Sequence, residues 1–481
     1  MSDLISRGAV LTASRLSNFA IQLLSPILLV RILDVEAYGQ YQEFMIYAVL
    51  LTGVCSLAVD SSLTYFLPRF PERERSFILQ TSLITLALSG IGAGAVLLAK
   101  PLFLRLTTYD FVLPLVVYVF FFVNLGWLEY YWIAKREARK VLYYSALRLI
   151  LRVVVLLVSA YLTRDVMTIA WSIAAFEAAR VLWAFAYCSR RELFRGDLSW
   201  RGVVEQMKFA APIGTAALLQ NAGRNLGKIF VSATLGPVAL AYYAIGSYLI
   251  PIIRLMRSGI SDAIYPELVA AHDRRTAAVG LWQRVNILNC VMFFPAFVLL
   301  LFYSEEIIQL LFTQAYIPAV PVFCIFAFFL IRRCFNTDVL LRTSGRTGFM
   351  LWGTVGSLIL NIALIVVFSK SLGMTGPALA FLMSEIALEL FYASQMSRTL
   401  GLNLSSFADW KSIGRVAAAC VVALPVLLAF EYVPLGEILR AAAASVLYAT
   451  LVLLVSYRLG VKDIGRVANF VRSRIRRLSR G

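Results

Sequence analysis

The sequence is poor in charged residues and almost devoid of histidine. Charged residues make up 15% of its 481 residues, against about 25% in soluble domains. The single histidine, His272, falls in a polar stretch between hydrophobic blocks. The patterns H-E-x-x-H, G-x-x-x-x-G-K-[ST], G-x-S-x-G and G-x-G-x-x-G are missing. We therefore predict that the protein is not an enzyme and binds no cofactor. Any energy that it needs would come from ion gradients, the membrane potential or the substrate's own gradient.

The cysteines also lack the spacing that disulfide frameworks or metal sites require. No two of them form a C-x-x-C pair, and most fall inside hydrophobic stretches. We interpret them as small packing residues. They are Cys55, Cys188, Cys290, Cys324, Cys334 and Cys420.

Long hydrophobic runs are what the chain has in abundance. Hydrophobic residues make up 60% of it, and a bilayer-spanning helix needs about 20 mostly apolar residues. The sequence predicts an all-α polytopic membrane protein of about 14 transmembrane helices, with no room for a large soluble domain. The predicted spans are 9–33, 41–66, 77–99, 111–133, 142–163, 166–188, 209–234, 239–263, 285–303, 318–341, 348–368, 375–397, 413–430 and 438–457.

The basic residues alternate with these spans. The formal charge is +18, which would suit a nucleic-acid protein, but most Lys and Arg residues fall in alternate loops and in the tail after Arg458. This is the positive-inside pattern, so no nucleic-acid partner is expected. It predicts a bacterial inner-membrane protein with both termini cytoplasmic. The run Arg472–Arg480 is a topology signal or, alternatively, a contact for anionic membrane lipids.

The spans divide into two halves. We predict an N-terminal lobe at 1–188, a cytoplasmic linker at 189–208, a C-terminal lobe at 209–397, helices 13 and 14 at 398–457 and a basic tail at 458–481. At an offset of 202 residues, Tyr41 corresponds to Tyr243 and Asp60 to Asp262. Six-span halves that both begin in the cytoplasm are parallel repeats with a pseudo-two-fold axis along the membrane normal.

The leading helix of each predicted lobe carries polar residues on one face. The spacing of these residues corresponds to one side of a helix, and the alternatives are cavity lining and inter-helix hydrogen bonding. We interpret them as cavity-lining and substrate-binding. They are Arg15, Asn18 and Gln22 in the first helix, and Asn221, Arg224, Asn225 and Lys228 in the seventh.

Further charges fall inside spans, where they normally face protein or water and mark a pathway. Arginine suits phosphate or carboxylate oxygens, so we add Arg254, Arg257, Arg332 and Arg333 to the candidate substrate site. Candidate coupling carboxylates, each of which could instead pair with an arginine, are Asp60, Glu177, Asp262, Asp338, Glu385 and Glu389. Residues near predicted span ends, expected to extend toward the headgroups, are Arg31, Arg148, Arg152 and Arg440.

Two segments carry a family resemblance. They are the stretch from Arg31 to Tyr41, RILDVEAYGQY, and the stretch from Ser304 to Pro321 with its SEEIIQLLF and AYIPAVP sequences. With the polar first helix, they resemble the polysaccharide transporter branch of the multidrug/oligosaccharidyl-lipid/polysaccharide exporter superfamily, which includes the Wzx-type flippases. The resemblance implies two six-helix lobes around a cationic cavity. It also implies movement of a polyprenyl-pyrophosphate-linked oligosaccharide to the outer leaflet by alternating access.

Three rival functions remain, and the least specific is a structural or assembly-scaffold role. A cation-coupled drug or metabolite exporter of the same superfamily would favour acidic residues and aromatics in its cavity, whereas this sequence favours arginine. A membrane polysaccharide polymerase or ligase would need a sizeable outer loop, and the longest expected here is 304–317. For the preferred function, the expected partners are the lipid-linked oligosaccharide, a proton or sodium ion for coupling, and polysaccharide polymerase or chain-length proteins.

Overall fold

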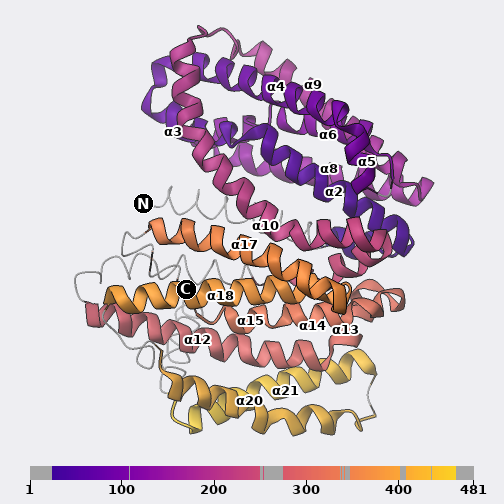
Figure 1. The fold of residues 1–481 in the computed structure, drawn as a ribbon, viewed down its shortest axis with the longest axis vertical. Coiled ribbons are helices and arrows are strands. Elements are labelled where there is room, and N and C mark those ends of the chain that lie inside the picture. Colours follow the sequence, from indigo (N-terminus) through magenta and orange to yellow (C-terminus); the bar gives the residue numbers. More distant parts are fainter. Residues whose placement is uncertain are drawn as a thin grey trace, which may run out of the picture. The chain divides into compact units, whose positions relative to one another are not determined.

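A computed structural model describes residues 24–107, 109–249, 253, 275–335, 337, 341, 347–400, 408–434 and 436–461. Every element in these ranges is a helix (Figure 1), as the sequence predicts. Twelve helical segments, some of them made of two or more consecutive elements, are long and apolar enough to cross a membrane. The expected spans 9–33 and 239–263 lie largely outside the described residues, so the total of fourteen stays a prediction.

Contacts between residues divide the chain into two compact units. Unit 1 runs to Ala244 and includes Leu311–Ala315, and unit 2 holds the rest. In chain order, the described helices of unit 1 are α2 (Val35–Ser56), α3 (Val59–Arg69), η1 (Pro71–Arg73), α4 (Glu74–Leu98), α5 (Lys100–Leu106), α6 (Val112–Val123), α7 (Leu128–Ala134), α8 (Ala138–Thr163), α9 (Val166–Arg190) and α10 (Trp200–Gly246), whose last two residues belong to unit 2.

Unit 2 is built from antiparallel helix pairs. Its helices are α12 (Arg275–Phe302), α13 (Ser304–Phe312), η2 (Gln314–Ala319), α14 (Val320–Ala327), α15 (Phe329–Arg332), α17 (Thr347–Leu372), α18 (Thr375–Leu400), α20 (Trp410–Phe430) and α21 (Glu437–Arg458). The pair α17 and α18 packs along its length, and α20 pairs with α21 beside α12 (Figure 1). The last two helices share a small core around Ala423 and Tyr448.

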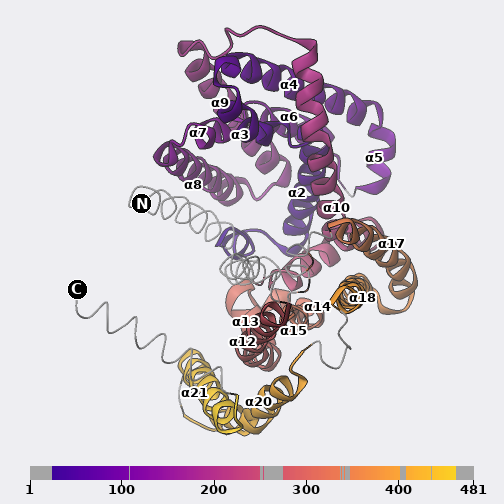
Figure 2. The ribbon, with the colours of Figure 1, turned by 90° about the vertical axis from the view of Figure 1, so that its left-hand side faces the viewer.

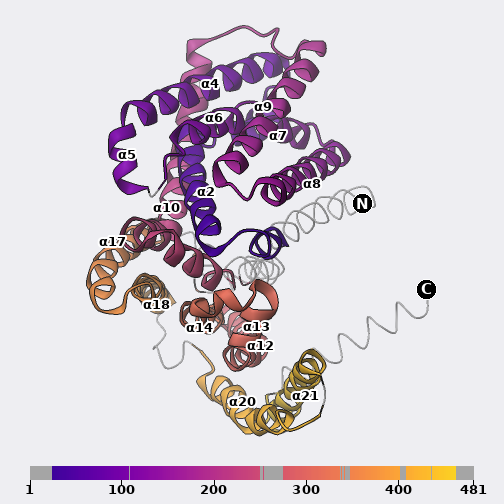
Figure 3. The ribbon, with the colours of Figure 1, turned by 90° about the vertical axis from the view of Figure 1, so that its right-hand side faces the viewer.

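Helix α10 belongs by its contacts to unit 1, which sequence repetition did not anticipate. It runs along α2 (Figures 2 and 3). A Cβ on Gly214 would lie 2.3 Å from the carbonyl oxygen of Leu57, and Ser232 Oγ donates to Glu43 Oε1 at 2.5 Å. By contacts, the change of unit falls after Ala244, and the linker expected at 189–208 stays a prediction. Glycine and serine at these positions let the two backbones approach closely.

Several helices are interrupted where the sequence predicts continuous spans. Leu57 and Ala58 have φ values of 41° and 58° and separate α2 from α3. Leu125 has φ 57° and lies in the turn between α6 and α7, and the turn at Phe328 separates α14 from α15. Non-glycine residues rarely adopt positive φ, so only surrounding contacts can hold such breaks.

One end of unit 1 gathers basic residues and is called the basic end here. It is where α4, α8 and α10 begin and α3, α7 and α9 end. Lys135, in the turn between α7 and α8, bonds to Glu74 at the start of α4. In the segment before α10, the backbone N–H of Asp197 donates to Ser76 Oγ at 3.1 Å. These contacts between separate loops show that the basic loops lie together at one end.

Candidate functional site

Part of the candidate site lies outside the described residues, and the rest lies on five helices in the two units. Those outside are Arg15, Asn18, Gln22, Arg254, Arg257, Asp262 and Asp338. Those described are Asn221, Arg224, Asn225 and Lys228 on α10, Asp60 on α3, Glu177 on α9, Arg332 and Arg333 at the end of α15, and Glu385 and Glu389 on α18.

The polar face of α10 is bonded within itself. Arg224 Nη2 donates to Asn221 Oδ1, and Asn225 Nδ2 donates to the carbonyl oxygen of Asn221 at 3.0 Å. All four polar residues are half-buried. For Lys228, the described part of the chain offers neither an ion pair nor a hydrogen bond. An ammonium group inside a bilayer needs water, a carboxylate or an anionic ligand, so Lys228 is the residue of this face that most requires an outside partner.

This polar face is centred on the side of α10 that packs against α2. With 3.6 residues per turn, Asn221, Asn225 and Lys228 lie within about 40° of the line that joins Gly214 to Ser232. Gly214 meets Leu57 at the end of α2, and Ser232 bonds to Glu43 within it. Arg224 lies about 80° from that line. The centre of this helix face therefore packs against α2. Its edge, where Arg224 lies, is the part left for contact with a substrate.

A second group of charges lies inside unit 1, centred on Glu177. The side chain of Glu177 is fully buried and accepts from Arg180 Nε at 2.5 Å. Arg148 Nη2 approaches the same carboxylate at 3.4 Å, and Arg148 Nη1 lies 3.6 Å from Glu129 Oε1. Glu177 thus pairs with arginine, the alternative to coupling that the sequence leaves open, within a larger ion-pair network that joins α7, α8 and α9.

Arg180 also holds the break in the fourth span. Its Nη2 donates to the carbonyl oxygens of Phe121, Phe122 and Asn124 at 2.6, 3.1 and 3.0 Å. These carbonyls end α6 and have no next helical turn to bond. Unpaired carbonyls cannot be tolerated in lipid, so the guanidinium of Arg180 makes the interrupted helix possible inside the bilayer.

Arg148 and Arg152 do not extend toward the headgroups as expected. Helix α8 begins at Ala138, earlier than the predicted 142, which places both arginines near its middle and on its inner side. Arg152 Nη2 donates to Tyr118 Oη at 2.8 Å, and its guanidinium lies 5.8 Å from the Phe122 ring centroid. Buried partners on neighbouring helices therefore stabilise these two arginine side chains better than the lipid headgroup region would.

Asp60 lies where the breaks of the second and fourth spans come together. It is the second residue of α3, directly after the break at Leu57 and Ala58. A Cβ on Gly126, in the turn between α6 and α7, would lie 3.7 Å from Asp60 Oδ2. Oδ1 of Asp60 is buried without a hydrogen-bond partner in the described part of the chain. The carboxylate therefore sits at the junction of two interrupted helices.

Unit 2 contains a comparable ion-pair group between α15 and α18. Arg332 Nη2 lies 3.1 Å from Glu385 Oε2 and 3.5 Å from Glu389 Oε2, and Arg332 Nε donates to the backbone carbonyl of Glu385 at 3.1 Å. Arg333 Nη2 approaches Glu385 only to 3.8 Å. The two carboxylates thus pair with arginine, which is the alternative to proton exchange that the sequence leaves open.

The two units use the same device at corresponding positions. Glu385 follows Glu177 by 208 residues, and Arg332 follows Asn124 by the same interval. In unit 1, Arg180 of the sixth span donates to backbone carbonyls of the interrupted fourth span. In unit 2, Arg332 of the interrupted fourth span contacts the carboxylate and the backbone carbonyl of Glu385 in the sixth. The parallel relation between the halves stays a prediction.

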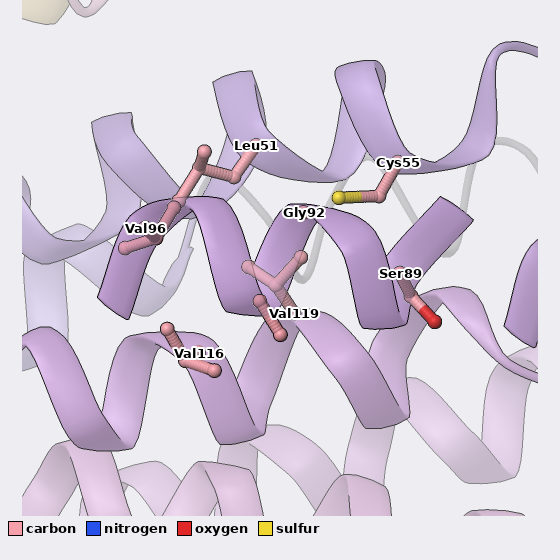
Figure 4. A pocket seen from close by; sticks show the side chains of 8 residues that line it. Leu51, Cys55, Ser89, Gly92, Val96, Val116 and Val119 are labelled. Atoms are coloured by element: carbon pink, nitrogen blue, oxygen red, sulfur yellow. The ribbon is translucent and has the colours of Figure 1, made fainter. Parts of the chain in front are cut away.

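A small cavity in unit 1 is lined mostly by apolar side chains (Figure 4). It is lined from α2, α4 and α6 by residues that include Cys55, Ser89 and Gly92, and its volume is about 10 Å³. A cavity of that size holds about one water molecule. It is too small for a sugar or a phosphate group. The structure shows no group of metal-ligating side chains in its described ranges.

Sequence reasoning missed several residues of these networks. Glu129 and Glu43 are charged residues near predicted span ends that turn inward to Arg148 and Ser232. Arg148 and Arg152 are spaced four residues apart, and Glu177 is the only carboxylate predicted within the sixth span. The spacing of the two arginines on one helix face was the signal that could have placed them inside the unit.

Comparison with known proteins identifies both family and fold. The family model described as "Polysaccharide biosynthesis protein" matches residues 4–272, while no curated protein sequence matches. Among solved structures, the lipid II flippase MurJ in an inward closed conformation has a TM-score of 0.64 at 13% identity, with 94% of this chain and 99% of that chain covered.

Multidrug transporters share the fold as well. An inward-facing multidrug resistance MATE family transporter of the MOP superfamily has a TM-score of 0.58 at 11% identity, covering 81% of this chain and 95% of the other. The MATE multidrug transporter DinF-BH has a TM-score of 0.56 at 13% identity, with coverages of 82% and 95%. At such identities the likeness establishes the fold.

Proposed function

The chain belongs to the polysaccharide biosynthesis protein family, a multi-pass membrane transporter family with the MOP superfamily fold, and we propose that it flips a polyprenyl-pyrophosphate-linked oligosaccharide from the cytoplasmic to the outer leaflet. The repeat unit would be that of an O-antigen, a capsule or an exopolysaccharide. In this proposal both termini lie in the cytoplasm, and the basic end of unit 1 faces the same side.

The polar face of α10 is the observation that carries the proposal. Arg224 and Lys228 lie on a helix that is long and apolar enough to cross the membrane. For Lys228, the described residues provide no compensating carboxylate. A pyrophosphate would supply that negative charge, and the asparagines Asn221 and Asn225 would bond sugar hydroxyls. Arg15, Asn18, Gln22, Arg254 and Arg257 complete the proposed site.

Arg332 and Arg333 have a different place in the proposal. Both already contact Glu385, and Arg332 also contacts Glu389, so a substrate phosphate would have to compete with fixed carboxylates. We assign them to holding α15 against α18. Coupling to protons or sodium would then rest on the other candidate carboxylates, among which Asp60 has a buried oxygen that no described group bonds.

The physical task explains why such a protein is required. A sugar-pyrophosphate headgroup cannot cross hydrocarbon because its polar groups would lose water without replacement. Polar and cationic side chains replace that hydration, while the prenyl tail stays in lipid. Alternating access then releases the headgroup on the other side, where a polymerase and chain-length proteins would receive the repeat unit.

Complementation of a strain that lacks the gene tests the proposal. Arg224→Ala and Lys228→Ala should abolish surface polysaccharide and leave the lipid-linked repeat unit on the cytoplasmic side, with normal amounts of protein in the membrane. Lys228→Arg should retain most activity. Arg440→Ala is the control, because Arg440 is a half-buried arginine near the start of α21 that donates to the Glu431 carbonyl. Normal polysaccharide in both alanine variants, or altered drug sensitivity alone, would contradict it.

A further inference from the structure

A column of stacked aromatic rings runs along the basic end of unit 1. The rings of Tyr144 on α8 and Trp183 on α9 are 5.6 Å apart between centroids and 21° from parallel, and Trp183 stacks in the same way on Tyr187 at 5.6 Å and 21°. The guanidinium of Arg191 covers the far ring, with 4.7 Å between Cζ and the Tyr187 centroid. Trp132 Nε1 donates to Tyr187 Oη at 3.3 Å.

The surface around this column is apolar and open. Trp183 is 50% exposed, and Leu182 beside it is 70% exposed. Tyr143 and Leu147 on α8 are also exposed. In a chain whose helices span a bilayer, an exposed apolar surface of this kind faces lipid.

The column lies at the depth of the lipid headgroups. About 20 helical residues cross the hydrocarbon. In α8, about 20 residues counted back from its last residue, Thr163, end close to Tyr144. In α9, about 20 residues counted forward from its first residue, Val166, end close to Tyr187. Two helices running in opposite directions thus place the boundary at the same aromatic column, which is where tyrosine and tryptophan collect in membrane proteins.

Three arginines lie just beyond the column toward solvent. Arg139, Arg190 and Arg191 are exposed, and none forms an ion pair within the described part of the chain. By contrast, Lys140 pairs with Glu137 at 2.7 Å. The positive-inside pattern accounts for basic residues at this end but not for one of them held on an aromatic stack.

We propose that this corner of α8 and α9 binds the headgroup of an anionic phospholipid of the adjoining leaflet. The phosphate contacts Arg191 and its neighbours Arg139 and Arg190, and an acyl chain lies along Trp183. Stacking on Tyr187 fixes the direction of the Arg191 guanidinium, so less side-chain freedom is lost when it binds. The site lies outside the substrate site proposed above and does not depend on it.

Lipid binding by the purified full-length protein tests this proposal. Bound lipids are counted by native mass spectrometry during titration with phosphatidylglycerol or with phosphatidylcholine of the same acyl chains. Arg139→Gln, Arg190→Gln and Arg191→Gln together should weaken phosphatidylglycerol binding at least about tenfold, since each basic residue near such a surface contributes about 1 kcal/mol. Trp183→Leu should weaken it as well, although it removes no charge.

The control removes the same charge from exposed basic residues of α10 and α20. Arg201→Gln, Lys208→Gln and Lys411→Gln should leave phosphatidylglycerol binding nearly unchanged. Equal loss in the control would mean diffuse attraction and would overturn the proposal. So would equal binding of phosphatidylcholine by the unaltered protein, or unchanged phosphatidylglycerol binding in Trp183→Leu. Thermal unfolding and size-exclusion profiles show that each variant is folded, and a variant that fails is replaced by Arg191→Gln alone.

Discussion

At the residue scale, the charges inside this membrane protein are mostly bonded to protein groups. Arg180 joins one carboxylate and three carbonyls, and Arg332 joins two carboxylates and a carbonyl. Removing one member of a buried pair leaves an uncompensated charge, which costs about 3–5 kcal/mol. These arginines are therefore expected to govern stability, and through it the amount of protein in the membrane.

Arg180→Ala should lower stability by about 3–5 kcal/mol and reduce the amount of folded protein. Arg180→Lys keeps the charge but has one nitrogen in place of the separate Nε and Nη2 that contact Glu177 and the three carbonyls, so it should be nearly as harmful. Thermal unfolding in detergent measures both. A lysine variant as stable as the unaltered protein would show that charge alone matters and that the capping of α6 does not.

Arg332→Ala and Arg333→Ala form a matched pair of neighbours. The Arg332 side chain is 7% exposed and lies 3.1 Å from Glu385, whereas that of Arg333 is 20% exposed and lies 3.8 Å from the same carboxylate. We expect a loss of about 3 kcal/mol or more for Arg332→Ala and about 1 kcal/mol or less for Arg333→Ala. Equal unfolding midpoints for the two would refute the proposed role of Arg332 in holding α15 to α18.

Asp165 offers a test of pH dependence at a helix end outside the bilayer. Its Oδ2 accepts from the Thr168 hydroxyl at 2.7 Å and from the Thr168 N–H at 2.8 Å, and these bonds lower the pKa of Asp165. The bonds therefore stabilise α9 above pH about 4, the ordinary Asp value, and the effect fades as pH falls through the lowered pKa.

Asp165→Ala should cost about 1 kcal/mol at neutral pH, while Asp165→Asn, which still accepts but cannot titrate, should cost less. The difference in unfolding midpoint between the unaltered protein and Asp165→Ala should shrink between about pH 5 and 3. A difference that stays constant over this range would show that the capping bonds do not depend on the charge of Asp165.

At the element scale, hydropathy predicted which segments are membrane helices but not how they are interrupted. The helical class and twelve long apolar helices agree with the sequence. The break at Leu57 and Ala58 contains neither glycine nor proline, so local propensity gives no sign of it. The Arg180 contacts come from a helix more than 50 residues away in sequence, and no local pattern contains that partner.

The contact between α10 and α2 can be tested with one glycine. Gly214→Val would place side-chain atoms against the Leu57 backbone, where even a Cβ lies at 2.3 Å, and should lower stability by about 1–3 kcal/mol through overpacking. Gly356→Val on α17 is the control, because a Cβ there meets nothing within 4 Å. If both variants unfold at the same temperature, the close approach of the two helices is wrong.

At the scale of the whole molecule, the charge pattern predicts sidedness. Arg139, the second residue of α8, and Arg164, directly after its last residue, lie at opposite ends of that helix, and only Arg139 belongs to the basic end. Of the six native cysteines, five are buried and Cys324 is half-buried, so reaction of introduced cysteines should dominate the signal.

Cysteine labelling in intact cells therefore checks the topology. Arg164→Cys should react with a membrane-impermeant maleimide added outside, and Arg139→Cys should react only after the membrane is opened. Insertion in the opposite sense, with the Arg139→Cys variant labelled in intact cells, would refute the cytoplasmic placement of the basic end. It would also remove the direction assumed for substrate movement.

The attachment of α10 to α2 also bears on how genes of this family can recombine. The sequence repeat suggests exchange at the linker expected at 189–208, but such a crossover would separate Gly214 from Leu57 and Ser232 from Glu43. Chimaeras joined after Ala244 would inherit both partners from one parent. Modularity in this architecture thus follows packing, and the unit that can be exchanged is longer than the unit that is repeated.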